Sequence, residues 1–239
     1  MVSHKYKCIF IHIPKCAGTS IEKALDHFDG KLSRGRQDHR SVRMIEKPFN
    51  PFKAARNPEN AKDAIRRFRE YFRSSSNPNN KLAVSSAQYK DYYKFSFVRN
   101  PWDRAFSWYK NAMRDPIHQK NYGIPAQISF DEFIKTFAGT GYLREQTYWL
   151  DNYSNKIDLD FVGKFENLAT DFDNICKAIG LSDRALPHEV KSNEASKTEY
   201  ISAEAAEFIS MFYQREIELF DYQFDRDCSL KIATAAADS

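Results

Sequence analysis

A short loop near the amino terminus carries the residues best suited to hold an anion. It consists of Pro14, Lys15, Cys16, Ala17, Gly18, Thr19 and Ser20. An apolar run at residues 8–13 predicts a buried strand before the loop, and residues 21–28 predict a helix after it, capped by Thr19 and Ser20. A small-residue turn between a strand and a helix gathers backbone N–H groups at the positive end of the helix dipole. The pattern predicts an anion-binding loop, in which Lys15 adds a charge and Gly18 allows close approach of the backbone.

The position of the lysine separates this loop from the ATP-binding P-loop. In G-x-x-x-x-G-K-[ST] the lysine follows the last glycine directly, whereas Lys15 lies three residues before Gly18. The hydroxyl of the ATP loop ligates Mg²⁺, which screens a polyphosphate, while a group of lower charge needs only a lysine and backbone amides. Taken alone, the loop could also be a simple strand-to-helix connection in which the lysine is incidental.

A second candidate motif follows another predicted strand, residues 93–99, which ends in Arg99. Pro101 suits the first turn of a helix predicted to run to Met113. Ser107 lies eight residues after Arg99, a spacing of about two helical turns. The planar guanidinium fork of arginine matches the geometry of a phosphate group.

Both motifs, residues 12–20 and residues 97–109, resemble those of sulfotransferases that use 3′-phosphoadenosine 5′-phosphosulfate (PAPS). The resemblance is to the family that includes the heparan and chondroitin O-sulfotransferases and small bacterial members. Weaker similarities occur at residues 161–168 and 193–197, so the resemblance covers residues 8 to about 224, weakly through 40–90. It implies transfer of a sulfuryl group from PAPS, without a metal, to a hydroxyl acceptor such as a carbohydrate.

The resemblance also assigns roles to individual residues. It implies that residues 14–20 hold the 5′-phosphosulfate, with Lys15 at the leaving phosphate oxygen, and that Arg99 and Ser107 hold the 3′-phosphate. Ser196 and Lys197 complete the donor-binding set. The sequence departs from the family at Cys16, where threonine is usual, and at Lys197, where histidine or arginine is frequent. These departures put the strength of donor binding in doubt.

Sulfuryl transfer needs a base for the proton of the acceptor hydroxyl. The histidines are His4, His12, His27, His39, His118 and His188. The resemblance implies that His39 is the base, and a solvated loop histidine is the alternative. We expect His12 to be a structural hydrogen-bonding residue and His27 to lie on the outer part of the first helix. Glu46 and Glu166 are the reserve candidates for the base.

Basic and aromatic residues offer contacts for the acceptor, each with a plainer alternative. An arginine cluster around His39 predicts either a grip on an anionic saccharide or a solvated basic loop; its members are Arg34, Arg36, Arg40 and Arg43. The candidates for acceptor binding are Arg40, Gln146 and Trp149. We expect residues 66–69 to be a solvated helix face. Of Trp102, Trp108 and Tyr109, we expect at least two to pack in the core, with stacking on adenine or a sugar as the alternative.

Composition narrows the functional class. The chain has 239 residues and a net charge of +4, which suits a local anion site better than a duplex-binding surface. Its four cysteines form no CxxC pair, so a zinc site and a disulfide framework are not indicated, and a reducing, cytoplasmic location is expected. The apolar run before Pro14 is too short for a signal peptide or a membrane span.

Alternating strands and helices predict an α/β fold of the P-loop-like kind, a three-layer sandwich with a central parallel sheet and helices on both faces, as a single domain over residues 1–239. Residues 159–165 predict a third strand. Predicted helices cover residues 59–73, 130–137, 170–179 (closed by Gly180) and 203–220, the last being the longest. Residues 29–58 predict a long loop with short helical turns, residues 47–80 an insert or lid, and residues 230–239 a frayed tail.

Two other functions remain possible on the sequence. A kinase-like phosphotransferase is disfavoured by the position of Lys15 and by the lack of a convincing Walker B strand ending in aspartate. A nucleic-acid-binding module would use the arginine-rich residues 34–73, and its binding would be sensitive to salt. A Mg²⁺ requirement would favour the first alternative, and nucleic-acid binding without affinity for PAPS would favour the second.

Overall fold

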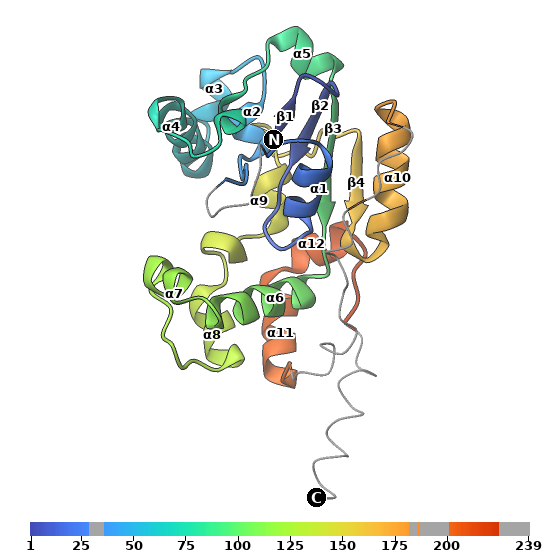
Figure 1. Ribbon diagram of the computed structural model, residues 1–239. Helices are drawn as coiled ribbons and strands as arrows, with labels where there is room; N and C mark the ends of the chain where they lie inside the picture. The colour runs from blue at the N-terminus through green and yellow to red at the C-terminus, as the bar shows by residue number, and fades with distance from the viewer. Residues whose placement is uncertain (29–35, 182–185, 187–200, 225–239) are drawn as a thin grey trace, which may run out of the picture. The chain divides into compact units, whose positions relative to one another are not determined.

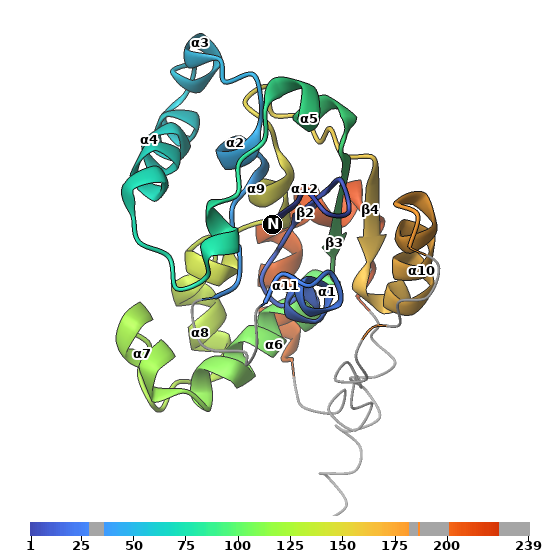
Figure 2. The same cartoon turned by 45° about the horizontal axis from the view of Figure 1, so that its top comes forward.

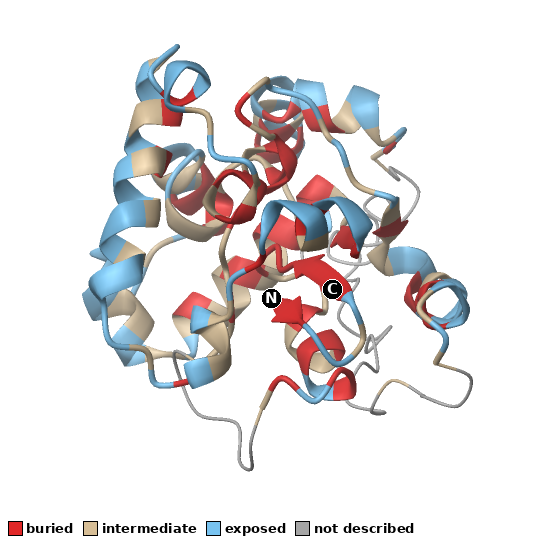
Figure 3. Ribbon diagram, turned by 90° about the horizontal axis from the view of Figure 1, so that it is seen from above, coloured by how far each residue is buried: buried red, intermediate tan, exposed pale blue. Residues whose placement is uncertain are grey.

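Four strands form one sheet in the order β1 (Val2–Ser3), β2 (Cys8–Ile11), β3 (Tyr93–Val98) and β4 (Phe161–Lys164) (Figure 1). β1 is antiparallel to β2, whereas β2, β3 and β4 are parallel, with Ile11 opposite Ser96 and Phe97 opposite Gly163. β2 and most of β3 are buried (Figure 3), as expected for parallel strands built from β-branched and aromatic residues. The predicted α/β class with a mostly parallel sheet is confirmed.

The computed structural model describes residues 1–28, 36–181, 186 and 201–224. These residues form two units. The first unit contains the described residues within Met1–Val98 and Gln146–Val190, and the second contains those within Arg99–Glu145 and Lys191–Ser239. The predicted frayed tail, residues 230–239, lies outside the described residues.

The first unit contains the sheet and a set of mostly short helices. They are α1 (Gly18–Ala24), α2 (Val42–Ile45), α3 (Pro51–Ala54), α4 (Pro58–Phe72), η1 (Pro78–Lys81), α5 (Ser86–Asp91), α9 (Gln146–Leu150), η3 (Phe165–Asn167) and α10 (Leu168–Ala178). α10 packs against β4, and α2 lies between α4 and the strands (Figures 1 and 2). Within the predicted loop over 29–58, residues 36–57 form a loop with short helical turns, as predicted, while Pro58 begins α4.

The second unit is helical in its described part. Its elements are α6 (Pro101–Met113), α7 (Pro116–Tyr122), α8 (Phe130–Phe137), η2 (Gly141–Leu143), α11 (Ala203–Phe212) and α12 (Gln214–Leu219). α8 packs against α6 and α11. Trp102 and Trp108 on α6 are buried, which confirms that they are core residues, and the Trp102 indole donates a 3.0 Å hydrogen bond to the Ala206 carbonyl.

Several predicted elements are confirmed with nearly their predicted bounds. α6 and α8 match, β3 ends one residue earlier than predicted, and α4 both begins and ends one residue earlier. α10 ends before Gly180, whose φ of 73° is the left-handed conformation expected of a glycine after a helix.

Two predictions of helix ends are wrong. α1 begins at Gly18, with Ala17 as its N-cap residue and no side-chain cap, so Thr19 and Ser20 lie inside its first turn rather than before it. The predicted helix over 203–220 is broken at Tyr213 into α11 and α12, and α4, with 15 residues, is the longest helix in the described ranges. Among the described residues, no helix has the length and apolar character needed to cross a membrane.

Candidate functional site

The loop between β2 and α1 has an unusual backbone. Lys15 has φ of 69° and Ala17 has φ of 62°, on either side of Cys16. The left-handed conformation costs a residue with a side chain roughly 1–2 kcal/mol, and two such residues so close together in sequence make a local reservoir of strain. Neighbouring residues of opposite handedness are the backbone arrangement of which anion-binding nests are built. The role of this loop in anion binding stays a prediction.

Gly18 is required because the loop rests on a histidine ring. A Cβ atom at position 18 would lie 1.9 Å from His12 Cδ2 and 2.1 Å from His12 Nε2. The His12 ring is buried beneath the loop. Close approach of the backbone to a side chain, rather than a left-handed φ, is thus the reason for this glycine.

Beneath the loop, His12 is held by a buried carboxylate on α1. His12 Nδ1 lies 3.0 Å from Glu22 Oε1, and the same oxygen accepts a 3.0 Å hydrogen bond from the backbone N–H of Asp38. Burial alone would raise the pKa of Glu22, but the neighbouring His12 holds that pKa below its ordinary value. The structural role expected for His12 is consistent with this pair.

His39 lies next to His12. Their ring centroids are 4.2 Å apart at an interplanar angle of 52°, and His39 Nδ1 lies 3.4 Å from the His12 carbonyl oxygen. Burial, and then the His12 ring, lower the pKa of His39 to about 3, so the imidazole is neutral near pH 7. The structure thus brings the predicted base to His12, which lies between β2 and the predicted anion loop.

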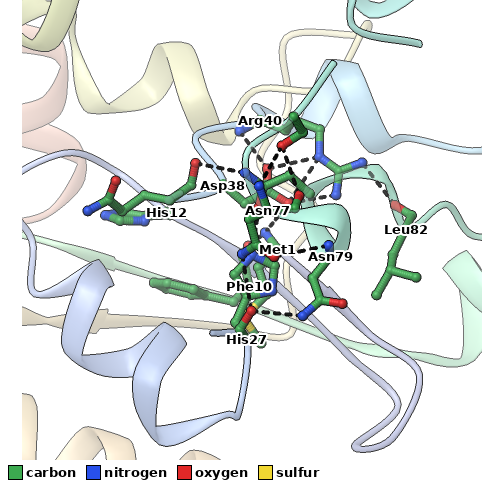
Figure 4. A network of polar contacts seen from close by, with 12 residues as sticks. Met1, Phe10, His12, His27, Asp38, Arg40, Asn77, Asn79 and Leu82 are labelled. Atoms are coloured by element: carbon green, nitrogen blue, oxygen red, sulfur yellow. Dashed lines mark hydrogen bonds and ion pairs between the residues drawn. The ribbon is translucent and has the colours of Figure 1, made fainter. Parts of the chain in front are cut away.

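Asp38 anchors the segment that carries His39, and Figure 4 shows its contacts with Arg40 and Met1. Its carboxylate accepts two hydrogen bonds from Arg40 Nε, at 2.9 and 3.1 Å, and lies 3.4 Å from the amine nitrogen of Met1. Burial would raise the pKa of Asp38, but Arg40 and the Met1 amine hold it well below its ordinary range. Arg40 also donates from Nη1 to the Leu82 carbonyl, so this acceptor-binding candidate is engaged in fixing the loop.

Three asparagines fasten both ends of the segment between α1 and His39. Asn77 donates to the carbonyls of His27 and Arg36, each at 3.1 Å, and Asn79 donates to the His27 carbonyl (Figure 4). Asn80 accepts a 2.7 Å hydrogen bond from the His27 ring. The expectation that His27 lies on the outer part of the helix is wrong, because its ring is buried against this clamp. Burial lowers the pKa of His27.

Gln146 and Trp149 lie on α9 and are buried. Gln146 Oε1 lies 3.4 Å from Cys16 Sγ, so α9 contacts the anion loop from its inner side. The Cys16 sulfur also lies 3.7 Å from the Pro14 carbonyl oxygen and is buried, as are Cys8 and Cys176. A role of Gln146 and Trp149 in acceptor binding stays a prediction.

Arg99 and Ser107 belong to the second unit. Arg99 directly precedes Asn100, whose side chain caps α6 by accepting from the N–H groups of Trp102 and Asp103, and Ser107 lies farther along α6. Both residues are half-buried. α6 is held by the buried Arg104, which donates to the carbonyls of Tyr142 and Arg144 at 2.9 and 2.7 Å. The phosphate-binding role of this pair stays a prediction, and Ser196 and Lys197 lie outside the described residues.

Arg43, for which a grip on a saccharide and a solvated loop were both open, and Arg67, which was expected to be solvated, are instead structural. Arg43 is buried, with Nη1 3.3 Å from Asp63 and Nη2 3.9 Å from Asp151. Arg67 donates from Nη1 to the carbonyls of Arg43 and Glu46, at 3.1 and 2.8 Å. The interpretation of residues 66–69 as a uniform solvated face is therefore wrong at Arg67.

The reserve bases differ in their surroundings. Glu46 accepts a 2.9 Å hydrogen bond from the Tyr153 backbone N–H, and Glu166 is exposed in η3. Glu22, which the sequence did not single out, is the carboxylate nearest His12 among the described contacts. Within the described ranges, no group of three or more His, Cys, Asp or Glu side chains is arranged to hold a metal ion.

A model of the sulfotransferase family matches residues 1–223 of the chain. The chain is 24% identical over 212 residues to carbohydrate sulfotransferase 14 of Homo sapiens, covering 79% of this chain and 47% of that protein. It is also 24% identical over 210 residues to carbohydrate sulfotransferase 11 of Danio rerio, covering 77% of this chain and 53% of that protein. It therefore spans about half the length of these two relatives.

Another relative matches a smaller part of the chain. An uncharacterized protein of Archaeoglobus fulgidus is 31% identical over 119 residues, which cover 49% of this chain and 89% of that protein. No solved structure matches the chain.

Proposed function

This chain belongs to the sulfotransferase family, and from that premise we propose that it transfers a sulfuryl group from PAPS to a hydroxyl of a carbohydrate. The single observation that supports this most is the loop of residues 14–20. Its residues Lys15 and Ala17 are left-handed, and Gly18 lies against His12 with no room for a side chain. The P-loop-like layer arrangement is part of the same proposal.

The residues fit the donor that the proposal requires. A nest of amides beside Lys15 suits a singly charged sulfuryl group attached to a phosphate, and it needs no metal ion. In this proposal residues 14–20 hold the 5′-phosphosulfate, while Arg99 and Ser107 hold the 3′-phosphate, with Ser196 and Lys197 as further contacts. When bound, PAPS supplies an activated sulfuryl group with a phosphate as the leaving group.

The protein's own groups then have two tasks. The Lys15 ammonium and the loop amides stabilise the charge that grows on the departing phosphate oxygen. His39 takes the proton of the acceptor hydroxyl. Its Nδ1–H faces the His12 carbonyl oxygen, which leaves Nε2 as the nitrogen with the lone pair. The Glu22 carboxylate favours the protonated form of His39 and so offsets part of the effect of burial.

The carbohydrate acceptor is proposed on two grounds. Human carbohydrate sulfotransferase 14 and the zebrafish relative both carry that substrate class in their names. The second unit also has a cavity of about 440 Å³ lined by Trp108, Tyr122 and Tyr142, with Asn121 and Thr140 at its wall. Aromatic rings beside amide and hydroxyl groups suit a sugar, which has apolar faces and a polar edge. Arg40, Gln146 and Trp149 remain proposed acceptor residues of the first unit.

Calorimetry with the product nucleotide, adenosine 3′,5′-bisphosphate, tests the donor assignment. We expect Arg99→Ala to weaken binding of the nucleotide and Lys15→Ala to reduce turnover more than binding. Lys23→Ala is the matched control, because it removes an exposed lysine from the same helix that follows the loop. Unchanged affinity in a folded Arg99→Ala protein would contradict the assignment. Activity lost in EDTA and restored by Mg²⁺ would instead favour a phosphotransferase.

A further inference from the structure

Helix α4 contacts the rest of its unit through polar side chains. Asn60 is buried and donates to the carbonyls of Lys53 and Tyr153, each at 3.1 Å. Asp63 is buried beside Arg43, and Arg67 donates to two carbonyls of the preceding segment. A surface helix of a globular protein ordinarily turns its apolar stripe inward. In α4 the inward face is instead polar.

The apolar residues of α4 point away from the unit and are exposed. The exposed fractions are 59% for Ile65, 67% for Phe68, 79% for Tyr71 and 69% for Phe72. Ile65, Phe68 and Phe72 are spaced by three and four residues, so they form one row on the helix. The Phe72 ring lies edge-on to Phe68 and Tyr71, with centroids 5.0 and 5.2 Å apart. We call these four residues the outer apolar face.

Cations border the outer apolar face on one side. Lys62 and Arg69 are exposed and lie three residues before and four residues after Ile65, which places them beside it on the helix. Arg66 is also exposed and lies on the same side. Around the helix, the inward polar face is thus followed by the basic border and then by the outer apolar face, which the described part of the chain leaves uncovered.

We propose that the outer apolar face and its basic border bind the surface of an anionic lipid bilayer. A helix with a strong apolar face, low mean hydropathy and arginine or lysine on its flank lies in the membrane interface, with its rings at the boundary between headgroups and acyl chains. Here the cations would meet lipid phosphates while Phe68 and Phe72 enter the boundary region. The proposal is independent of the sulfotransfer reaction.

Charge and ring geometry favour a bilayer over other occupants. A second copy of this chain packed antiparallel through this face would set the basic border against an identical basic border, whereas an anionic surface complements it. A single-stranded nucleic acid would stack its bases on open ring faces. The edge-on packing of Phe72 against Phe68 and Tyr71, with the aliphatic Ile65 beside them, forms a continuous apolar surface instead.

Sedimentation of the full chain with lipid vesicles tests the proposal. The probes are vesicles of phosphatidylcholine alone and of phosphatidylcholine mixed with phosphatidylglycerol. We expect binding to the mixed vesicles that weakens as salt is raised. Lys62→Gln with Arg69→Gln should lower the affinity about fivefold for each charge removed. Phe68→Ser with Phe72→Ser should lower it at least tenfold at every salt concentration.

A matched control separates this face from apolar exposure in general. Ile117 and Met211 are exposed apolar residues of the second unit, and Ile117→Ser with Met211→Ser should leave vesicle binding unchanged. All variants should keep the unfolding midpoint of the wild type, because the replaced side chains are exposed. In Phe68→Trp, tryptophan emission should shift to the blue with mixed vesicles.

Three results would overturn the proposal. The first is that the wild type does not bind mixed vesicles, and the second is that the Phe68→Ser, Phe72→Ser variant binds as well as the wild type. The third is another occupant of the face, shown either by a dimer in sedimentation that this variant abolishes or by a single-stranded oligonucleotide that binds the face more tightly than vesicles do.

Discussion

Replacing Gly18 by alanine should destabilise the protein, although helix propensity alone predicts the opposite. Gly18 is the first residue of α1 and its φ is not left-handed, so alanine would be favoured there by roughly 0.5–1 kcal/mol. Its Cβ would, however, lie 1.9 Å from His12 Cδ2. Ordinary contact begins near 3.4 Å, so the ring or the loop must move by about 1.5 Å.

The His12 ring has little room to move that far. Glu22 holds Nδ1 at 3.0 Å, and the rings of His39 and Phe10 lie on neighbouring sides, with centroids 4.2 and 5.8 Å away. Inserting an extra methyl group into a packed site typically costs about 1–3 kcal/mol. After the gain in helix propensity is subtracted, we expect Gly18→Ala to lower the free energy of unfolding by about 1–2 kcal/mol and to displace the anion loop.

Urea unfolding of a small set of variants measures this effect. Gly180→Ala is the control, because that glycine has φ of 73° and open space around it, so only the left-handed backbone is penalised, by roughly 1 kcal/mol. Gly18→Ala combined with His12→Ala should be less destabilised than the sum of the single variants by about 1 kcal/mol or more, because the ring that clashes is gone. A Gly18→Ala protein at least as stable as the wild type would refute the reasoning.

Three further outcomes follow from the buried groups. Arg43→Met should lower the free energy of unfolding by about 3–5 kcal/mol, because two buried carboxylates, Asp63 and Asp151, both lose their contact with the Arg43 guanidinium. The exposed Arg73→Met should change it little, and equal effects in urea unfolding would contradict this. Cys16 is buried, so it should react slowly with an alkylating agent, and its rate should be the same with and without adenosine 3′,5′-bisphosphate. Mass mapping of the labelled cysteines measures this rate, and rapid labelling that the nucleotide prevents would count against its burial. The pKa of His39 is about 3 in the folded protein and about 6.5 in the unfolded chain, so the unfolded chain binds more protons between these two pH values. The free energy of unfolding should therefore fall as pH drops from about 6.5 towards 3. His39→Gln should flatten this dependence in unfolding curves, and an unchanged slope would contradict the assignment.

Elements with strong local signals were predictable from the sequence. α6 has Pro101 in its first turn and an asparagine cap, and α8 begins with a capping box between Ser129 and Glu132, so both could be predicted with their bounds. The break at Tyr213 was not predictable. The helical spacing of apolar residues continues across Tyr213, and the hydrogen bond that its hydroxyl donates goes to the distant Leu143 carbonyl. Local patterns do not record such long-range bonds.

The candidate site likewise contains features that the sequence predicted and features that it did not. The loop between a strand and a helix was predictable because strand, lysine, glycine and helix follow one another within a short segment, while its binding of an anion stays a prediction. Glu22 was missed, since a glutamate on a helix ordinarily faces water and only the fold brings it to His12. The polar inward face of α4 was also missed. Asp63 and Arg67 both contact Arg43, which lies 20 and 24 residues earlier in the sequence, and a local pattern does not reveal such contacts.

Transfer of labelled sulfate from PAPS, in the presence of EDTA, tests the proposed function most directly. The acceptors are a panel of saccharides with phenols and lipids beside them, and the proteins are the wild type, Lys15→Ala, Arg99→Ala and the control Lys23→Ala. We predict labelled saccharide with the wild type and with Lys23→Ala, and none with the other two. Absence of any labelled acceptor with folded wild-type protein, or undiminished transfer by Lys15→Ala, would contradict the account.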